Sequence, residues 1–189
     1  MDDTKPVTIP ARRLVLRKPS SIDDARAGLW SEGIDQSRYG PDEDKYRAAI
    51  LEQYKLYVEM TDRASARRGL TNTFFLTLNT ALLAAGAGIA SHFTGHVGLQ
   101  ALVASALIVQ CAAWYSLLRS YRQLASVKYR VIGALEERLP ASPYWAAEWR
   151  AVGQGKDKAR YIPVTRLEQW VPAVFALAYV VAFLFQLNA

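Results

Sequence analysis

The sequence is poor in the residues that most often bind metals. It contains one cysteine, Cys111, and two histidines, His92 and His96. A single cysteine excludes an intrachain disulfide and any metal site built from a cysteine cluster. The two histidines lie four residues apart, but Gly95 and Gly98 surround the second and no third ligand is near, so an ordinary loop is favoured over a metal site. We therefore expect no metal and no cofactor.

Charge is also missing from two long stretches of the chain. No Asp, Glu, Lys or Arg occurs in residues 69–118 or after Glu168, although 21% of the chain is charged. A helix that crosses a bilayer needs about 20 predominantly apolar residues. Three segments qualify, residues 70–90, 99–118 and 167–187. The sequence thus predicts an all-α, polytopic membrane protein with three transmembrane helices. A buried hairpin of a soluble domain is the alternative, which so long a charge-free run disfavours.

The placement of Lys and Arg predicts the orientation of these spans. Arg67 and Arg68 precede the first span and Arg119 follows the second, whereas residues 91–98 and the tail after 187 contain neither Lys nor Arg. Cytoplasmic loops carry the excess of basic residues. We therefore expect a cytoplasmic N-terminus, an external loop at 91–98 and an external C-terminus.

The net charge of +6 raises the question of a nucleic-acid partner. The basic residues flank the spans and are mixed with carboxylates, which favours anionic lipid headgroups as the partner and not nucleic acid.

Helical periodicity continues beyond the first two spans. Residues 41–69 and 119–139 show apolar side chains at helical spacing, and Pro140 ends the second pattern. Because consecutive spans are antiparallel, their extensions should form an antiparallel cytoplasmic stalk. The residues expected to pack in this stalk are Tyr46, Ile50, Tyr54, Tyr57, Leu124, Val131, Gly133 and Leu135.

Equal distances from the membrane fix the expected register of the stalk. Tyr57 should lie near Arg130 and Val131, and Tyr54 near Gly133. A glycine inside a helix costs about 1 kcal/mol relative to alanine. At Gly133 it would leave room for a tyrosine ring from the other helix.

Two further segments complete the cytoplasmic part. Residues 1–40 contain several Pro and Gly and show no sustained period, so we expect an irregular arm. Residues 140–166 hold an aromatic group followed by a polar loop, and they offer a surface for a cytoplasmic protein partner.

Thr165 and Glu168 have the spacing of a capping box that would begin the last helix. Pro172 lies inside that helix and should kink it.

A polar stripe marks the first span. Its members, with one residue of the second span, are Asn72, Thr73, Thr77, Asn79, Thr80 and Gln110. Polar groups at membrane depth need internal partners. The stripe therefore predicts either interhelical hydrogen bonds that hold an assembly together or the lining of a pore, with apolar residues such as Phe74 and Phe75 facing lipid.

Candidate catalytic groups are weak. Gly153-Gln-Gly155-Lys156 lacks the spacing of a phosphate-binding loop and the hydroxyl residue that should follow the lysine. Glu136 and Glu137 are adjacent, so on a helix they diverge and are expected to be solvated charges. We expect a protein that is not an enzyme.

The chain resembles the RipA-family octameric membrane proteins of bacteria over residues 45–180. The residues that carry the resemblance are Arg67-Arg68-x-x-x-Asn72-x-Phe74-Phe75, Trp114, Tyr121, Lys128-Tyr129-x-Val131-Ile132, Leu135-Glu136, Leu139-Pro140, Pro143-Tyr144, Glu148-Trp149, Gly153-x-Gly155, Tyr161-x-Pro163, Thr165, Glu168 and Val171-Pro172. The resemblance implies a homo-octamer in the bacterial cytoplasmic (inner) membrane without assigned catalytic residues. A weaker likeness to two-span SLATT-type membrane effectors leaves the third span unexplained.

These observations predict a non-enzymatic structural or scaffolding assembly in the membrane. The alternative is a gated pore lined by the polar face of the first span.

Overall fold

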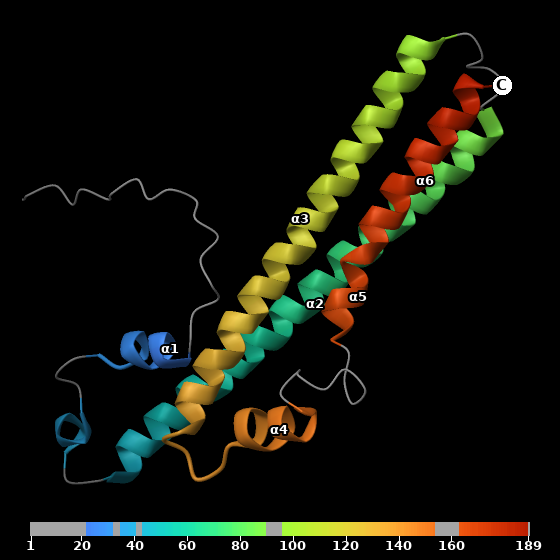
Figure 1. Ribbon diagram of the computed structural model, residues 1–189. Coiled ribbons are helices and arrows are strands. Elements are labelled where there is room, and N and C mark those ends of the chain that lie inside the picture. The colour runs from blue at the N-terminus through green and yellow to red at the C-terminus, as the bar shows by residue number, and fades with distance from the viewer. Residues whose placement is uncertain (1–21, 32–34, 41–42, 90–95, 154–162, 189) are drawn as a thin grey trace, which may run out of the picture.

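A computed structural model describes residues 22–31, 35–40, 43–89, 96–153 and 163–188 (Figure 1). Most of the predicted N-terminal arm, of the external loop and of the polar loop after Gly153 lies outside the described residues. All regular structure in the described part is helical, in agreement with the all-α prediction.

Two long helices form the body of the molecule. α2 runs from Glu43–Ile89 over 47 residues and α3 from Val97–Glu136 over 40 residues, side by side in opposite directions (Figure 1). At ~1.5 Å per residue the longer one spans about 70 Å. Each helix continues without a break through its charged and its apolar segment, as the continued helical periodicity predicted.

The predicted register of α2 and α3 is correct to within one helical turn. The Tyr57 ring lies under the ammonium of Lys128, with 4.9 Å between the nitrogen and the ring centroid, and the Tyr54 hydroxyl donates to Glu136 at 3.1 Å. The expected neighbours were Arg130 and Val131 for Tyr57 and Gly133 for Tyr54, which lie two or three residues from the observed partners.

The residues that were predicted to pack between α2 and α3 differ in how far they are buried. Ile50, Gly133 and Leu135 are buried and Tyr46, Tyr54, Tyr57 and Val131 are partly buried. Leu124 was predicted to pack and is 47% exposed. The inward face of α3 follows Leu118, Lys128, Ile132 and Leu135, and Leu124 lies outside it.

The C-terminal helices pack along the apolar half of α2 and α3. α5 covers Val164–Glu168, α6 covers Trp170–Leu187, and Gln169 separates them. Pro172 explains the position of this break. A proline ring clashes with the carbonyl four residues earlier, here that of Glu168, so the helix is interrupted just before Trp170 and α6 continues unbroken through the proline.

The predicted capping box is wrong. α5 begins after Pro163 without any side-chain cap, and Thr165 lies inside the helix. Glu168 instead forms an ion pair with Arg68 of α2, in which both side chains are 19% exposed. A partner on another helix is therefore preferred over the local backbone donors.

Two helical segments of the described part are long and apolar enough to cross a membrane. One is α3, Val97–Glu136, and the other is α5 together with α6, Val164–Leu187. Within the apolar 18-residue stretch of each segment, only 17% and 11% is buried inside the molecule, whereas the core helix of a soluble protein would be mostly buried. α2 is not one of the two, and its charge-free half carries Asn72 and Asn79 among its leucines.

Short helices surround the charged end of the α2 and α3 pair. They are α1 (Ile22–Leu29), η1 (Gln36–Tyr39), the π-helical turn η3 (Pro143–Glu148) and α4 (Trp149–Ala151). Arg26 of α1 binds Glu137 at 2.9 Å and lowers the pKa of that carboxyl. The guanidinium of Arg138 stacks on Trp30 at 3.5 Å from the ring centroid. These contacts attach α1 to the end of α3.

Candidate functional site

A buried polar cluster joins the three apolar helices. Asn79 of α2 is completely buried, and its Oδ1 accepts a hydrogen bond of 2.9 Å from the hydroxyl of Tyr179 on α6. The same oxygen lies 3.6 Å from the thiol of Cys111 on α3, and the Asn79 amide nitrogen donates to the Phe75 carbonyl at 2.8 Å. One amide group thus contacts α3 and α6 and its own helix.

An aromatic layer lies next to this cluster. Trp114 of α3 has no exposed surface and stacks on Phe75 with ring centroids 5.7 Å apart. The ring of Phe175 on α6 is tilted by 48° to the Trp114 ring, with the two centroids 6.0 Å apart. The indole N–H donates to Asn72 Oδ1 at 3.2 Å. Trp114 therefore touches both other helices and satisfies its only donor.

The predicted polar stripe is split between two faces. Asn72 and Asn79 turn toward α3 and α6, whereas Thr73, Thr77 and Thr80 are exposed. The hydroxyl of Thr80 donates to its own backbone, at the Leu76 carbonyl. Phe75 was expected to face lipid, and this is wrong, because its ring stacks on Trp114 of α3 on the same side as the asparagines.

Gln110 does not join the cluster. Its Nε2 is buried and has no hydrogen-bond partner among the described residues. Sequence reasoning missed Tyr179, whose hydroxyl donates to Asn79 from α6. Its signal was present, because Tyr179 carries one of the few polar groups in an otherwise apolar span.

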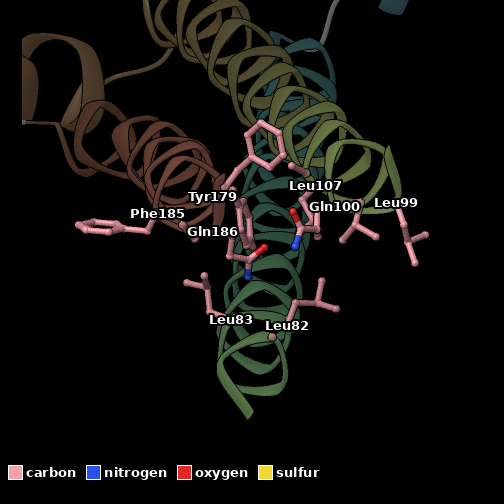
Figure 2. A pocket seen from close by; sticks show the side chains of 13 residues that line it. Leu82, Leu83, Leu99, Gln100, Leu107, Tyr179, Phe185 and Gln186 are labelled. Atoms are coloured by element: carbon pink, nitrogen blue, oxygen red, sulfur yellow. The ribbon is translucent and has the colours of Figure 1, made fainter. Parts of the chain in front are cut away.

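Beyond the cluster an apolar pocket of about 420 Å³ opens between the ends of the three helices. Leucines of α2 and α3 form its walls, and the amides of Gln100 and Gln186 point into the space between the helices (Figure 2). Tyr179 closes its inner end, whereas Phe185 points away from it (Figure 2). Among the described residues, the polar groups that line the pocket are the amides of Gln100 and Gln186 and the hydroxyl of Tyr179, which can form hydrogen bonds.

A second polar cluster lies at the charged end of the bundle. Glu136, predicted to be solvated, is 1% exposed. Its carboxylate accepts hydrogen bonds from the Tyr54 hydroxyl at 3.1 Å, the Ser142 hydroxyl at 2.6 Å and the backbone N–H groups of Tyr144 and Trp145 at 3.1 and 2.9 Å. Burial and then the charge of Glu136 raise the pKa of Tyr54 to about 12, so this hydroxyl remains a donor at neutral pH.

Gly133 has a different role from the predicted one. A Cβ atom at this position would lie 2.8 Å from the Trp145 ring, so the glycine admits the indole of η3 and not a tyrosine of α2. Glu136 and Gly133 together fix the position of η3, the first by its hydrogen bonds and the second by the space that it leaves for Trp145. Among the described residues, no three His, Cys, Asp or Glu side chains lie close enough together to bind a metal ion.

The Asn79 cluster leads to a prediction about stability. Replacing Asn79 with leucine or Tyr179 with phenylalanine should each lower the thermal stability of the detergent-solubilised protein. A double-mutant cycle should give a coupling of roughly 1 kcal/mol, because one hydrogen bond between apolar helices is worth about that much. The exposed Thr80→Val change is the control. Since the bond lies within one chain, the mass of the particle should not change. A lower mass without loss of thermal stability would show that Asn79 acts between copies instead.

The comparison with known proteins places the chain in a family. The model of the octameric membrane protein family (8xMP) matches residues 51–188. No curated protein and no solved structure matches the chain. The matched region contains α3, α6, residues 51–89 of α2 and every residue of both polar clusters. A match over this much of the sequence shows that the chain belongs to the octameric membrane protein family.

Proposed function

We propose that the protein is a non-enzymatic scaffold of the bacterial inner membrane, assembled from eight copies of this chain. Its three spans would lie in α2, α3 and α6, with the N-terminus in the cytoplasm and the C-terminus outside. The charged halves of α2 and α3 would then project into the cytoplasm as a stalk. The family supports the membrane location and the copy number, and the placement of Lys and Arg supports the orientation.

The exposed surface of the charged halves carries this proposal. Leu56 and Met60 of α2 are 53% and 50% exposed, and Leu124 and Val127 of α3 are 47% and 42% exposed. These residues stand among charged side chains and not in the charge-free segments, so lipid would not cover them. Apolar patches outside a membrane usually mark contacts between proteins. A second copy of the chain is the occupant that an octameric family provides.

The first span in α2 has support of a different kind. Its two asparagines are used inside the chain, and the large side chains Leu70 and Phe74 are 72% and 61% exposed. Inward amides and outward apolar groups are the arrangement that a helix in lipid requires.

A pore is the second candidate, and the exposed threonine face of α2 favours it. Thr73, Thr77 and Thr80 would line a water-filled path if copies turned this face toward a common axis. Dye release from liposomes that contain the purified protein separates the two functions. A scaffold retains the dye, whereas a pore releases it at a rate that Thr77→Leu changes.

The oligomer is tested by placing charge on the exposed apolar surface. The double change Leu56→Glu and Met60→Glu should reduce the mass of the solubilised particle below that of an octamer, because eight copies would each bury two carboxylates without partners. Helix content by circular dichroism should remain, since both side chains point away from α3. The control is Ala48→Glu with Ala66→Glu, which adds equal charge at exposed positions on a different face of α2. Equal masses for the two double variants would refute the assignment of this surface.

A further inference from the structure

A basic cavity lies where α3 passes the junction of α5 and α6. Its volume is about 280 Å³. The side chains that line it are Tyr115, Arg122, Arg166, Gln169, Trp170 and Ala173. Two of these are arginines that come from different helices, α3 and α5, so the fold and not the local sequence brings them together.

No carboxylate among the described residues compensates the positive charge of the cavity. Arg122 donates to the neutral amide oxygen of Gln169 at 2.9 Å. The carboxylate of α5, Glu168, is already paired with Arg68 of α2. Within the described ranges, neither Arg122 nor Arg166 forms an ion pair with a carboxylate. An anion is therefore the group that the cavity lacks.

The position of the cavity along the helices indicates where that anion comes from. Arg122 follows the charge-free stretch of residues 69–118 by only a few residues, and Trp170 begins the last apolar helix with 71% of its surface exposed. Tryptophan and tyrosine are enriched at the level of the lipid headgroups. With the topology proposed above, on which this step rests, the cavity faces the headgroups of the cytoplasmic leaflet.

We propose that this cavity binds a phosphate-bearing anion through Arg122 and Arg166, with the headgroup of an anionic phospholipid as its source. The planar guanidinium groups can each donate two hydrogen bonds to phosphate oxygens. The Trp170 indole and the Ala173 methyl provide apolar surface for the glycerol and the first part of the acyl chains. Basic pockets between transmembrane helices on the cytoplasmic side are known to hold such headgroups.

The test measures binding of three probes to the full-length protein in detergent by native mass spectrometry. The probes are short-chain phosphatidylglycerol, short-chain phosphatidylcholine and inorganic phosphate. Arg122→Gln with Arg166→Gln should weaken binding of phosphatidylglycerol about 100-fold or more, the factor expected when two hydrogen bonds to a charged phosphate are lost. The control variant is Arg67→Gln with Arg119→Gln, which removes the same charge at the same level of α2 and α3 and should bind nearly as the wild type does.

The probes separate the two sources of phosphate. Preference for phosphatidylglycerol supports the lipid headgroup, whereas equally tight binding of inorganic phosphate that the cavity variant abolishes assigns the site to a soluble phosphate compound. Equal losses in both double variants, or equal binding of phosphatidylcholine, would overturn the proposal, because the attraction would then be diffuse or hydrophobic. Particle mass and membrane fractionation, recorded on the same samples, test the proposed scaffold separately from the site.

Discussion

Replacing Glu136 with alanine is expected to detach the segment after α3 and to lower the free energy of unfolding by about 3–5 kcal/mol. The substitution leaves the backbone N–H groups of Tyr144 and Trp145 and the Tyr54 hydroxyl without their common acceptor. A buried donor without a partner costs about 1–3 kcal/mol, and these penalties are not fully additive within one cluster. Thermal unfolding of the solubilised protein measures the loss.

The adjacent carboxylate provides the control for this experiment. Glu137 is exposed and binds Arg26 of α1, which is also exposed. Glu137→Ala should therefore change the stability little, although it removes the same charge. Limited proteolysis between Pro140 and Gly153 should increase only for Glu136→Ala. If both variants unfold at the same temperature, the hydrogen bonds of Glu136 do not hold this segment.

Replacing Trp114 with alanine is expected to separate the three apolar helices and to cost about 3 kcal/mol. The indole is completely buried between Phe75 and Phe175 and donates to Asn72. Removal of a buried tryptophan from a soluble core costs about 3–5 kcal/mol. We expect the lower end, because lipid tails solvate the released aromatic surfaces better than water does.

Two variants separate packing from hydrogen bonding at this position. Trp114→Phe retains an aromatic ring and should recover more than half of the loss, whereas Asn72→Leu removes only the acceptor and should cost about 1 kcal/mol. Tyr115→Ala is the matched control, because Tyr115 is adjacent but 41% exposed. A Tyr115 variant as unstable as Trp114→Ala would contradict the central position of the indole.

The long helices and their register were predictable from the sequence because they depend on local signals. Helical spacing and the absence of a breaker determine the lengths of α2 and α3, and equal distances from the turn determine which residues meet. The contact between Tyr57 and Lys128 therefore lies within one turn of the prediction. The inward position of Asn79 was also predictable, because an amide in an apolar helix needs hydrogen-bond partners from other parts of the protein.

The features that the sequence did not predict depend on α6 and on the segment after α3, both of which pack back against α2 and α3. The polar stripe was assigned to one face because only α2 was considered, whereas α6 packs on part of that face and leaves the threonines outside. Glu136 and Glu137 are equivalent in the sequence, and only the turn after α3 makes one buried and the other exposed. The partner of Glu168 is Arg68, which no local pattern connects to it.

The distance along the chain between α6 and its partners has a consequence for the order of assembly. Arg68 and Glu168, like Asn79 and Tyr179, are 100 residues apart in the sequence. The hairpin of α2 and α3 needs only the short connection between the helices to close, and closure of a short loop loses less chain entropy than closure of a long one. The hairpin should therefore form while α6 is still being synthesised. Docking of α6 is then the last step in the folding of each subunit, and it creates both the Asn79 cluster and the basic cavity.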